Sequence, residues 1–314
     1  MNVLFTMEIP TELKEKQKKQ FPEIKNYYTS KIAQFPNLAE VDVIVTFGID
    51  LTEKIIEQAK RLKWIMVFSA GVELLPTEKI KEKGITVTNA RGIHAVPMAE
   101  FVFAYLLNEV KNLTQLKNKA EAREWADDVP IFELKGSKLF IAGTGAIGEK
   151  IAALGKAFEM KTIGFNTSGH EANNFDETYA LKDVRKQVKQ ADFFVSILPN
   201  TTTTAYVYDK AFFQEMSQHA VFINIGRGKA VSLDVIKEAA VNQEIAHFYL
   251  DVLEKEPLPA DEMLWNLNNV TITPHISAHS SQYLVRCFTI WFTNLNNQKE
   301  GKALLNSIDL NKGY

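Results

Sequence analysis

The stretch Ala142-Gly143-Thr144-Gly145-Ala146-Ile147-Gly148 constrains the fold of this chain more than any other segment. Residues 138–141 before it are predicted to form a short buried strand, and residues 149–158 after it a helix with one apolar face. The three glycines then suit the tight turn, the approach of a pyrophosphate and the contact between helix and strand. Backbone N–H groups near Ala146 and Ile147 would face that pyrophosphate at the helix N-terminus. In this setting the pattern predicts a dinucleotide-binding domain.

The chain before this motif is long enough to form a domain of its own. Gly143 is preceded by 142 residues, and a total length of 314 residues favours two domains. Strand and helix patterns alternate in this region, which is typical of an α/β fold with a parallel sheet. The predicted strands are residues 3–5, 43–45 and 65–68, the helices between them residues 11–20 and 52–62, and a long apolar helix follows at residues 97–116.

A second α/β series begins at Lys138 and supplies enough strands for a doubly wound sheet. After it comes a helix at residues 280–299, and the closing segment 304–314 is expected to pack back onto the first domain. We therefore predict two Rossmann-like domains, a doubly wound parallel-sheet dinucleotide-binding domain (97–284) inserted in a smaller flavodoxin-like substrate domain (1–96 plus 285–314). A cleft between the domains is the expected site of chemistry. The predicted strands of the second series are residues 139–142, 162–165, 193–197, 221–225, 248–251 and 270–272.

Composition excludes several classes of partner. The formal net charge of −2 gives no reason to expect nucleic acid or an anionic membrane as a partner. The N-terminus has no basic region typical of a signal peptide, and no apolar run reaches the roughly 20 residues of a membrane span. The single cysteine, Cys287, excludes an intramolecular disulfide and a cysteine-based metal site, and no metal is predicted. These features favour a cytoplasmic protein.

The end of the second predicted strand bears on the choice of cofactor. An acidic residue about 20 positions after the glycines would bind the ribose 2′-hydroxyl of NAD(H). This chain has Asn166 there, which removes the repulsion against a 2′-phosphate, while Thr167 and Ser168 offer hydroxyl donors. The loop has no arginine, and Asn166 binding plain ribose hydroxyls remains an alternative. We predict NADP(H) in preference to NAD(H).

Three further segments follow predicted strands, where open α/β sheets bind their ligands. Arg227 stands between two glycines after the strand at 221–225, and its planar guanidinium suits a carboxylate and an adjacent carbonyl. Glu256 follows Asp251 in the next segment, and His275 follows Pro274 in the last. Each of these residues alone is compatible with a purely structural role. Their coincidence at the ends of neighbouring strands favours a catalytic site.

With these motifs in their order, the sequence resembles the D-isomer-specific 2-hydroxyacid dehydrogenases, the group that includes glyoxylate/hydroxypyruvate reductases and phosphoglycerate dehydrogenase. The resemblance spans nearly the whole chain. The motifs that carry it are Ser69-Ala70-Gly71-Val72, Gly92-Ile93-His94 with Pro97-Met98-Ala99-Glu100, the Gly143 motif, Asn224 to Gly228, Asp251 to Pro257, and Thr273 to Ile276.

The resemblance implies a role for each candidate residue. Arg227 would bind the substrate carboxylate and carbonyl, His275 would donate the proton in reduction, and Glu256 would orient His275. The backbone of Ala70 and Gly71 would offer N–H groups to the substrate carboxylate. The implied cofactor contacts are Gly143, Thr144, Gly145, Ala146, Ile147, Gly148, Asn166, Thr167, Ser168, Pro199, Ile225, Gly226, Arg227, Asp251, His275 and Ser277.

These roles are chemically consistent. Hydride addition to a ketone leaves an alkoxide that needs a proton, and an imidazolium supplies one near neutral pH. A neighbouring carboxylate favours the charged imidazole, and a guanidinium polarises the carbonyl. Two departures from the family pattern, Asn166 and Ser232, do not touch this proton relay.

The predicted function is therefore reduction of a small 2-oxo acid by NAD(P)H to a D-2-hydroxy acid. The alternative is a non-catalytic protein that senses NAD(P)(H) on the same scaffold, and phosphoglycerate dehydrogenase is a third candidate. The apolar run Phe101–Leu107 is predicted to form either interdomain core or a dimer surface. The family resemblance favours a homodimer.

Overall fold

The computed structural model describes residues 1–310 and divides into two compact units. Unit 1 contains Met1–Ile93 and the chain from Ser280 onward, and unit 2 contains His94–His279. Both boundaries fall slightly before the predicted ones at 96/97 and 284/285. The first differs because α4 begins at Ala95 and packs its buried face into unit 2, and the second because the chain from Ser280 leads into a helix of unit 1.

Unit 1 is built on a five-stranded parallel sheet in the order β2-β1-β3-β4-β5, which is the flavodoxin-like order. Two of these strands, β2 and β5, were not predicted from the sequence. Both lie at the edges of the sheet, and their segments mix polar and apolar residues. The strands are β1 (Asn2–Phe5), β2 (Lys25–Tyr28), β3 (Val43–Thr46), β4 (Trp64–Val67) and β5 (Thr86–Asn89).

Helices cover the two faces of this sheet with separate apolar cores. The long C-terminal helix contributes Trp291, which packs on Trp64 with ring centroids 4.7 Å apart and donates its indole N–H to Gln17. Beyond that helix, Ile308 donates its backbone N–H to Val87 of β5, so the chain end returns to the sheet of unit 1. Residues 311–314 of the predicted closing segment lie outside the described residues. The helices are α1 (Thr11–Gln20), α2 (Glu53–Gln58), α3 (Thr77–Glu82) and α10 (Tyr283–Lys299).

Unit 2 carries a seven-stranded parallel sheet in the order β12-β11-β10-β9-β6-β7-β8, so the predicted fold class is confirmed. The prediction of six strands was wrong by one, because the edge strand β8 has a half-buried, mixed sequence that carries no strong strand signal. The strands are β6 (Lys138–Ala142), β7 (Lys161–Asn166), β8 (Glu177–Ala180), β9 (Phe193–Ser196), β10 (Val221–Asn224), β11 (His247–Leu250) and β12 (Val270–Ile272).

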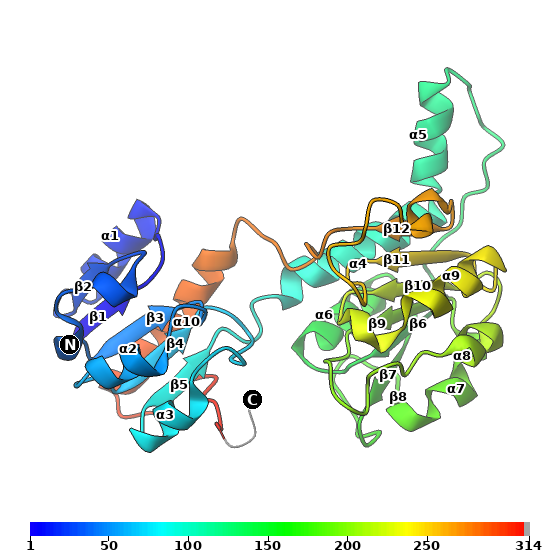
Figure 1. Ribbon diagram of the computed structural model, residues 1–314. Coiled ribbons are helices and arrows are strands. Elements are labelled where there is room, and N and C mark those ends of the chain that lie inside the picture. The colour runs from blue at the N-terminus through cyan, green and yellow to red at the C-terminus, as the bar shows by residue number, and fades with distance from the viewer. Residues whose placement is uncertain (311–314) are drawn as a thin grey trace. The chain divides into compact units, whose positions relative to one another are not determined.

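The long helix predicted at 97–116 is in fact two helices. The chain breaks at Asn112, which adopts a left-handed conformation with φ of 48°, and the second helix starts directly after it. In Figure 1 this second helix and the chain after it extend away from the sheet of unit 2. The helices of unit 2 are α4 (Ala95–Val110), α5 (Leu113–Glu121), α6 (Ala146–Ala157), α7 (Val184–Gln187), α8 (Lys210–Glu215) and α9 (Leu233–Val241). Short 3-10 turns complete both units at Ile32–Gln34, Leu38–Glu40, Leu181–Asp183, Val188–Gln190, Gly228–Ala230 and Met263–Asn266.

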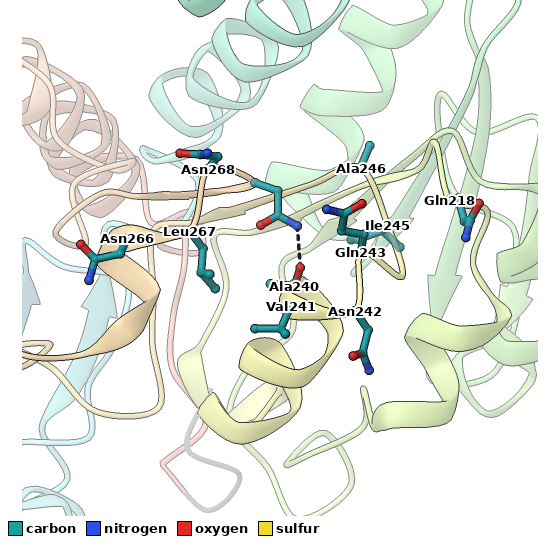
Figure 2. A pocket seen from close by; sticks show the side chains of 11 residues that line it. Gln218, Ala240, Val241, Asn242, Gln243, Ile245, Ala246, Asn266, Leu267 and Asn268 are labelled. Atoms are coloured by element: carbon teal, nitrogen blue, oxygen red, sulfur yellow. Dashed lines mark hydrogen bonds between the residues drawn. The ribbon is translucent and has the colours of Figure 1, made fainter.

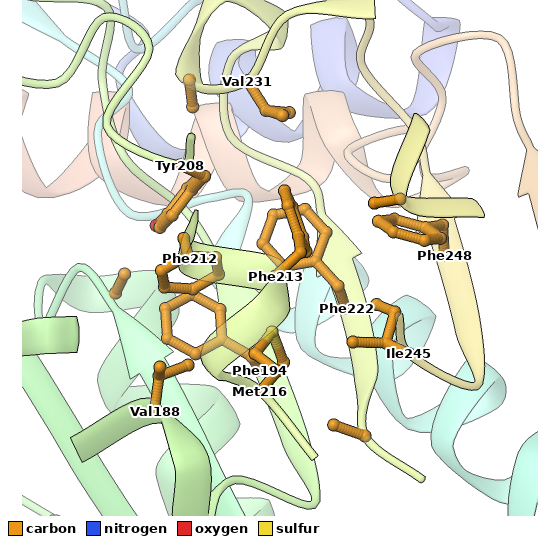
Figure 3. Packing of buried hydrophobic residues seen from close by; sticks show 14 of the residues in the cluster. Val188, Phe194, Tyr208, Phe212, Phe213, Met216, Phe222, Val231, Ile245 and Phe248 are labelled. Carbon is orange, nitrogen blue, oxygen red and sulfur yellow. The ribbon is translucent and has the colours of Figure 1, made fainter. Parts of the chain in front are cut away.

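The sheet of unit 2 separates two apolar cores. One core is an aromatic cluster in which Phe194, Phe212 and Phe222 pack at ring distances of 5.1 to 6.3 Å (Figure 3). The other lies under α4 and α6 and takes in Val102, Phe103 and Leu106. The predicted run Phe101–Leu107 therefore contributes to the core of unit 2 itself. Close packing on both faces holds the strand ends, and the loops that follow them, in fixed positions.

Candidate active site

The predicted site residues of unit 2 lie along one edge of its sheet. Because all its strand pairs are parallel, the carboxyl ends of the strands share an edge. Gly143 follows β6, and Asn166 ends β7. Arg227, Glu256 and His275 follow β10, β11 and β12. This edge is where ligands of open α/β sheets bind.

The glycine motif forms the turn between β6 and α6. Gly143 has φ of +111°, and a Cβ on Gly148 would lie only 1.9 Å from the carbonyl oxygen of Gly143, so both positions require glycine. Gly145 differs, because a Cβ there would meet nothing within 4 Å. Gly145 and Ala146 are exposed at the start of the helix, where backbone N–H groups lack intrahelical partners. The motif therefore leaves room for a pyrophosphate against α6, and its residues fit a dinucleotide.

Asn166 organises the loop that follows β7. Its amide nitrogen donates to the Thr144 hydroxyl at 3.2 Å and to the His170 carbonyl at 2.8 Å. Its side-chain oxygen accepts the backbone N–H of Ser168 at 3.3 Å and of Gly169 at 2.7 Å. The side chains of Thr167 and Ser168 remain exposed, and the Ser168 hydroxyl lies 3.0 Å from His170 Nδ1. The loop thus presents two hydroxyls and an imidazole, with no carboxylate at position 166.

Arg227 is exposed at the end of β10, and its Nη1 donates to the Gly226 carbonyl at 2.9 Å. Asn224 fixes this turn by accepting the Gly226 N–H at 3.2 Å and donating to the Arg227 carbonyl at 3.3 Å. Burial, together with the charge of Arg227, lowers the pKa of His94, so this imidazole favours the neutral form. His94 precedes α4 without making the side-chain cap bond expected of a capping residue. Its proximity to Arg227 was not predicted, because no local pattern links positions 94 and 227.

The other predicted cofactor contacts also follow strands of this sheet. Pro199 lies beyond β9, and its carbonyl accepts the Thr204 hydroxyl at 2.5 Å. Ile225 is buried directly after β10 and donates its N–H to Ser196. Ser277 is buried beyond β12. These segments line the same edge as the glycine motif.

His275 and Glu256 form a direct pair. His275 Nδ1 lies 2.9 Å from Glu256 Oε2, and because a carboxylate can only accept, Nδ1 carries the shared proton. The other carboxylate oxygen accepts the backbone N–H of Leu253 at 2.9 Å, which fixes the orientation of Glu256. Both side chains remain partly exposed. The imidazole therefore presents Nε2 as the nitrogen available to exchange a proton with a ligand.

Asp251 is almost fully buried, with 1% of its surface exposed, and it forms several hydrogen bonds to the loop that carries His275. Its carboxylate accepts three hydrogen bonds, from the Thr273 hydroxyl at 2.7 Å, the Ile276 N–H at 2.9 Å and the Ser277 N–H at 3.0 Å. Its backbone carbonyl accepts the His275 N–H at 2.9 Å. Asp251 thus acts on the conformation of the loop that carries the imidazole.

Ala70 and Gly71 belong to unit 1 and follow β4 in the sheet of that unit. The Ala70 carbonyl accepts the side-chain amide of Asn89, and the Gly71 carbonyl accepts the Ser69 hydroxyl at 2.7 Å. Both bonds engage carbonyl oxygens, so they leave the N–H groups of this loop to other partners. Arg227, Glu256 and His275 belong to unit 2.

Two cavities of unit 2 differ in their position relative to this edge. A cavity of about 760 Å³ lies at the opposite, amino ends of β10, β11 and β12, and none of the residues lining it is titratable (Figure 2). A smaller apolar cavity of about 300 Å³ includes Glu256 and His275 in its wall. Of these two cavities, the smaller one therefore contains the pair of Glu256 and His275.

The described chain, residues 1–310, contains no group of three or more His, Cys, Asp or Glu side chains arranged to hold a metal ion. None of its described helices has the length and apolar character needed to cross a bilayer.

Comparison with known proteins decides the family. The model of the D-isomer specific 2-hydroxyacid dehydrogenase NAD-binding domain matches residues 103–277, which is more than half of the 314 residues. The chain belongs to this family. The resemblance inferred from the sequence is thereby confirmed, and the family's dehydrogenases are NAD(P)-dependent oxidoreductases.

Similarity to individual members extends beyond that domain. The chain is 30% identical over 250 residues to hydroxypyruvate reductase of Thermotoga maritima, an alignment that covers 78% of this chain and 80% of the relative. It is 29% identical over 278 residues to D-3-phosphoglycerate dehydrogenase of Methanocaldococcus jannaschii, covering 87% of this chain but only 52% of that longer protein. A solved family member from Aeromonas salmonicida superposes with a TM-score of 0.85 at 30% identity, covering 98% of this chain and 99% of that one.

Proposed function

We propose that this protein reduces a small 2-oxo acid to the corresponding D-2-hydroxy acid, with NAD(P)H as the hydride donor. The observation that carries this proposal is the bond of 2.9 Å between His275 Nδ1 and Glu256 Oε2 at the carboxyl edge of a dinucleotide-binding sheet. A protein that merely bound the cofactor would have no need of an imidazole paired with a carboxylate and left open on its other nitrogen.

In the proposed reaction His275 is the proton donor. Glu256 stabilises the imidazolium and directs Nδ1 toward itself, so that Nε2–H faces the substrate oxygen. A bound reduced nicotinamide would supply the hydride. Delivery of a proton from Nε2 neutralises the alkoxide that forms, and the neutral imidazole keeps its Nδ1 proton on the side of Glu256. In the reverse direction the neutral Nε2 accepts the proton of the hydroxy acid.

Arg227 is proposed to bind the substrate carboxylate and to polarise the adjacent carbonyl. Its guanidinium is exposed at the end of β10 and offers a planar set of donors that matches two neighbouring oxygen groups. We propose that His94 stays neutral beside it, so that a second cation does not compete for the same anion. The backbone N–H groups of Ala70 and Gly71 are proposed to contact the substrate carboxylate as well.

For the cofactor we propose the segment Gly143–Gly148 as the pyrophosphate site and NADP(H) as the preferred form. Asn166 puts no carboxylate beside the ribose and holds a loop in which Thr167 and Ser168 expose their hydroxyls. Both hydroxyls can donate to a 2′-phosphate. Pro199, Ile225, Gly226, Asp251 and Ser277 are proposed to border the nicotinamide end.

We further propose that the active form is a homodimer. The segment 113–133, called the arm below, exposes the large apolar side chains Leu113, Trp125, Ile131 and Phe132. Several large exposed apolar side chains on one segment favour an association surface there.

The assay that tests the proposal follows the absorbance of the reduced nicotinamide. Purified protein is mixed with NADPH or NADH and with glyoxylate, hydroxypyruvate, or a branched or aromatic 2-oxo acid. We expect oxidation with at least one of these acids, with a higher kcat/KM for NADPH than for NADH. Binding of cofactor without oxidation by any acid would favour the sensor instead, and equal or better use of NADH would overturn the cofactor preference.

A further inference from the structure

The loop that carries His275 holds an unusual backbone conformation. His275 has φ of 56°, in the left-handed region that residues other than glycine adopt uncommonly. Such a conformation persists only where surrounding bonds enforce it. Here the enforcing group is Asp251, which accepts the backbone N–H groups of His275, Ile276 and Ser277 on its carbonyl and carboxylate oxygens.

A hydroxyl chain reaches the same carboxylate from α4. The Thr273 hydroxyl lies 2.7 Å from Asp251 Oδ1, and the Tyr105 hydroxyl lies 3.0 Å from the Thr273 oxygen. A carboxylate can only accept, so Thr273 donates its single hydroxyl hydrogen to Asp251. Tyr105 must then donate to Thr273. Burial raises the pKa of Tyr105 to about 12, which keeps this phenol protonated as a donor.

The position of Tyr105 is itself fixed by aromatic packing. Its ring stacks on Tyr249 with centroids 4.2 Å apart and meets the edge of Phe101 at 5.0 Å. The two stacked tyrosines send their hydroxyls to different partners. Tyr249 donates to Glu109 at 2.9 Å and accepts from Asn108, so it makes no bond to the His275 loop.

We propose that Tyr105 and Thr273 are positioning residues that act through Asp251 to hold His275 in its left-handed conformation. Tyr105 connects helix α4 to the loop through its bond to Thr273. Thr273 in turn orients the Asp251 oxygen that also accepts the Ile276 N–H. A polarised chain of this kind strengthens the bond from the Thr273 hydroxyl to Asp251, and this bond fixes the carboxylate that accepts the Ile276 and Ser277 N–H groups. The effect on turnover rests on the proposed function, whereas the effect on the loop does not.

The decisive experiment is hydrogen–deuterium exchange of the full-length protein without ligands, read on peptides spanning residues 273–279. Tyr105→Phe keeps the ring stack and removes only the hydroxyl. We expect exchange of the His275, Ile276 and Ser277 amides to become about 2- to 10-fold faster, the loss expected for one hydrogen bond. Tyr249→Phe is the matched control, because it removes the neighbouring hydroxyl, and it should leave this peptide unchanged.

A second pair of variants, at Thr273, tests the proposal independently of the Tyr105→Phe substitution. Thr273→Val deletes the middle of the chain and should speed exchange at least as much as Tyr105→Phe, while Thr273→Ser retains the hydroxyl and should restore slow exchange. Wild-type exchange in Tyr105→Phe or Thr273→Val would overturn the proposal. Equally fast exchange in Tyr105→Phe and Tyr249→Phe would also overturn it, since general loosening of the stack would then be the cause.

Kinetics supply an independent readout. With 2-oxo acid and NAD(P)H, Tyr105→Phe should lower kcat by a similar factor while the cofactor Kd, measured without substrate, stays at the wild-type value. An unchanged kcat would confine Tyr105 to a purely structural role. Absence of turnover in the wild type would instead contradict the proposed function and would leave the exchange result standing.

Discussion

At the scale of single residues, the proposed proton transfer depends on an imidazole that is fixed at two points. Glu256 holds Nδ1, and Asp251 holds the backbone on both sides of the ring. The sequence predicted that His275 and Glu256 follow strands of one sheet, and the resemblance to the 2-hydroxyacid dehydrogenases implied that Glu256 orients His275. It predicted Asp251 only as a cofactor contact, since nothing local shows that its carboxylate accepts bonds from Thr273, Ile276 and Ser277.

Replacement of His275 tests the relay directly. His275→Gln keeps a polar side chain of similar reach but cannot donate a proton as an acid, so kcat should fall by about 10²- to 10⁴-fold. Cofactor affinity, measured by quenching of protein fluorescence, should stay close to that of the wild type. Glu256→Gln is the companion variant, expected to show a smaller loss because it keeps a bond to Nδ1. Turnover at the wild-type rate in His275→Gln would remove this residue from the reaction.

A second histidine of unit 2 should affect stability and not catalysis. His247 lies at the start of β11 with Nε2 at 2.8 Å from the Thr271 hydroxyl, and burial lowers its pKa to about 4. The pKa of the folded state is then below the unfolded value of about 6.5, so protonation favours the unfolded chain. The free energy of unfolding should fall as the pH drops from 6.5 toward 4, by about 2 kcal/mol between pH 6.5 and 5.

Urea titrations across this pH range measure that slope. In His247→Gln the slope should be shallower, although the lowered pKa of His94 acts in the same direction and leaves part of it. His279→Gln, at an exposed position, is the matched control. Identical pH slopes for His247→Gln and the wild type would contradict the prediction.

At the scale of elements, what could be predicted depended on position in the sheet. Interior strands such as β3 and β9 are largely apolar and buried on both faces, and such runs can be recognised in a sequence. The missed strands β2, β5 and β8 are all edge strands, where one side of the strand has no neighbour and the sequence is mixed. The bond between Tyr105 and Thr273 was equally beyond prediction, because 168 positions separate the two residues.

Two glycines of the turn between β6 and α6 are expected to differ in role, Gly148 serving the packing of the turn and Gly145 facing the ligand. Gly148→Ala places a Cβ against the Gly143 carbonyl, so it should lower the free energy of unfolding by about 1–3 kcal/mol. Gly145→Ala points its methyl group into open space and should change that free energy by less than about 1 kcal/mol. Its effect should be on the cofactor, with a raised Kd for NADP(H).

Urea denaturation and cofactor titration of both variants provide the measurement, and each variant is the control for the other. If Gly145→Ala bound NADP(H) as tightly as the wild type, the pyrophosphate would not approach α6 at this residue. If Gly148→Ala unfolded at the wild-type urea concentration, the turn would be able to relax around the added methyl group.

At the scale of the whole molecule, the chain leaves unit 1 after Ile93 and returns to it at Ser280. Unit 1 depends on that return, because α10 contributes Phe288, Trp291 and Leu295 to one of its two cores. The position of the glycine motif, far from the N-terminus, follows from this arrangement. A dinucleotide-binding sheet inserted between two parts of another unit has to begin after the first of these parts.

The arm of unit 2 bears on assembly. Its base is tied to α4, since Phe132 donates its N–H to Val110 and Asn112 donates its side-chain amide to Pro130. The arm exposes 94% of the surface of Trp125 and, at its base, 61% of the surface of Phe132. An anchored segment that displays large apolar side chains gains stability when a second copy covers it.

Light scattering after size-exclusion chromatography tests that assembly. The wild type should elute with twice the chain mass of 35.5 kDa, and the double variant Trp125→Glu/Phe132→Glu should shift to the single mass, because two charges would have to be buried in the contact. Ile49→Glu is the matched control, since Ile49 is 76% exposed in unit 1, and it should remain dimeric. A wild type with the mass of one chain at all concentrations, or a double variant that stays dimeric, would show that the arm does not join two copies.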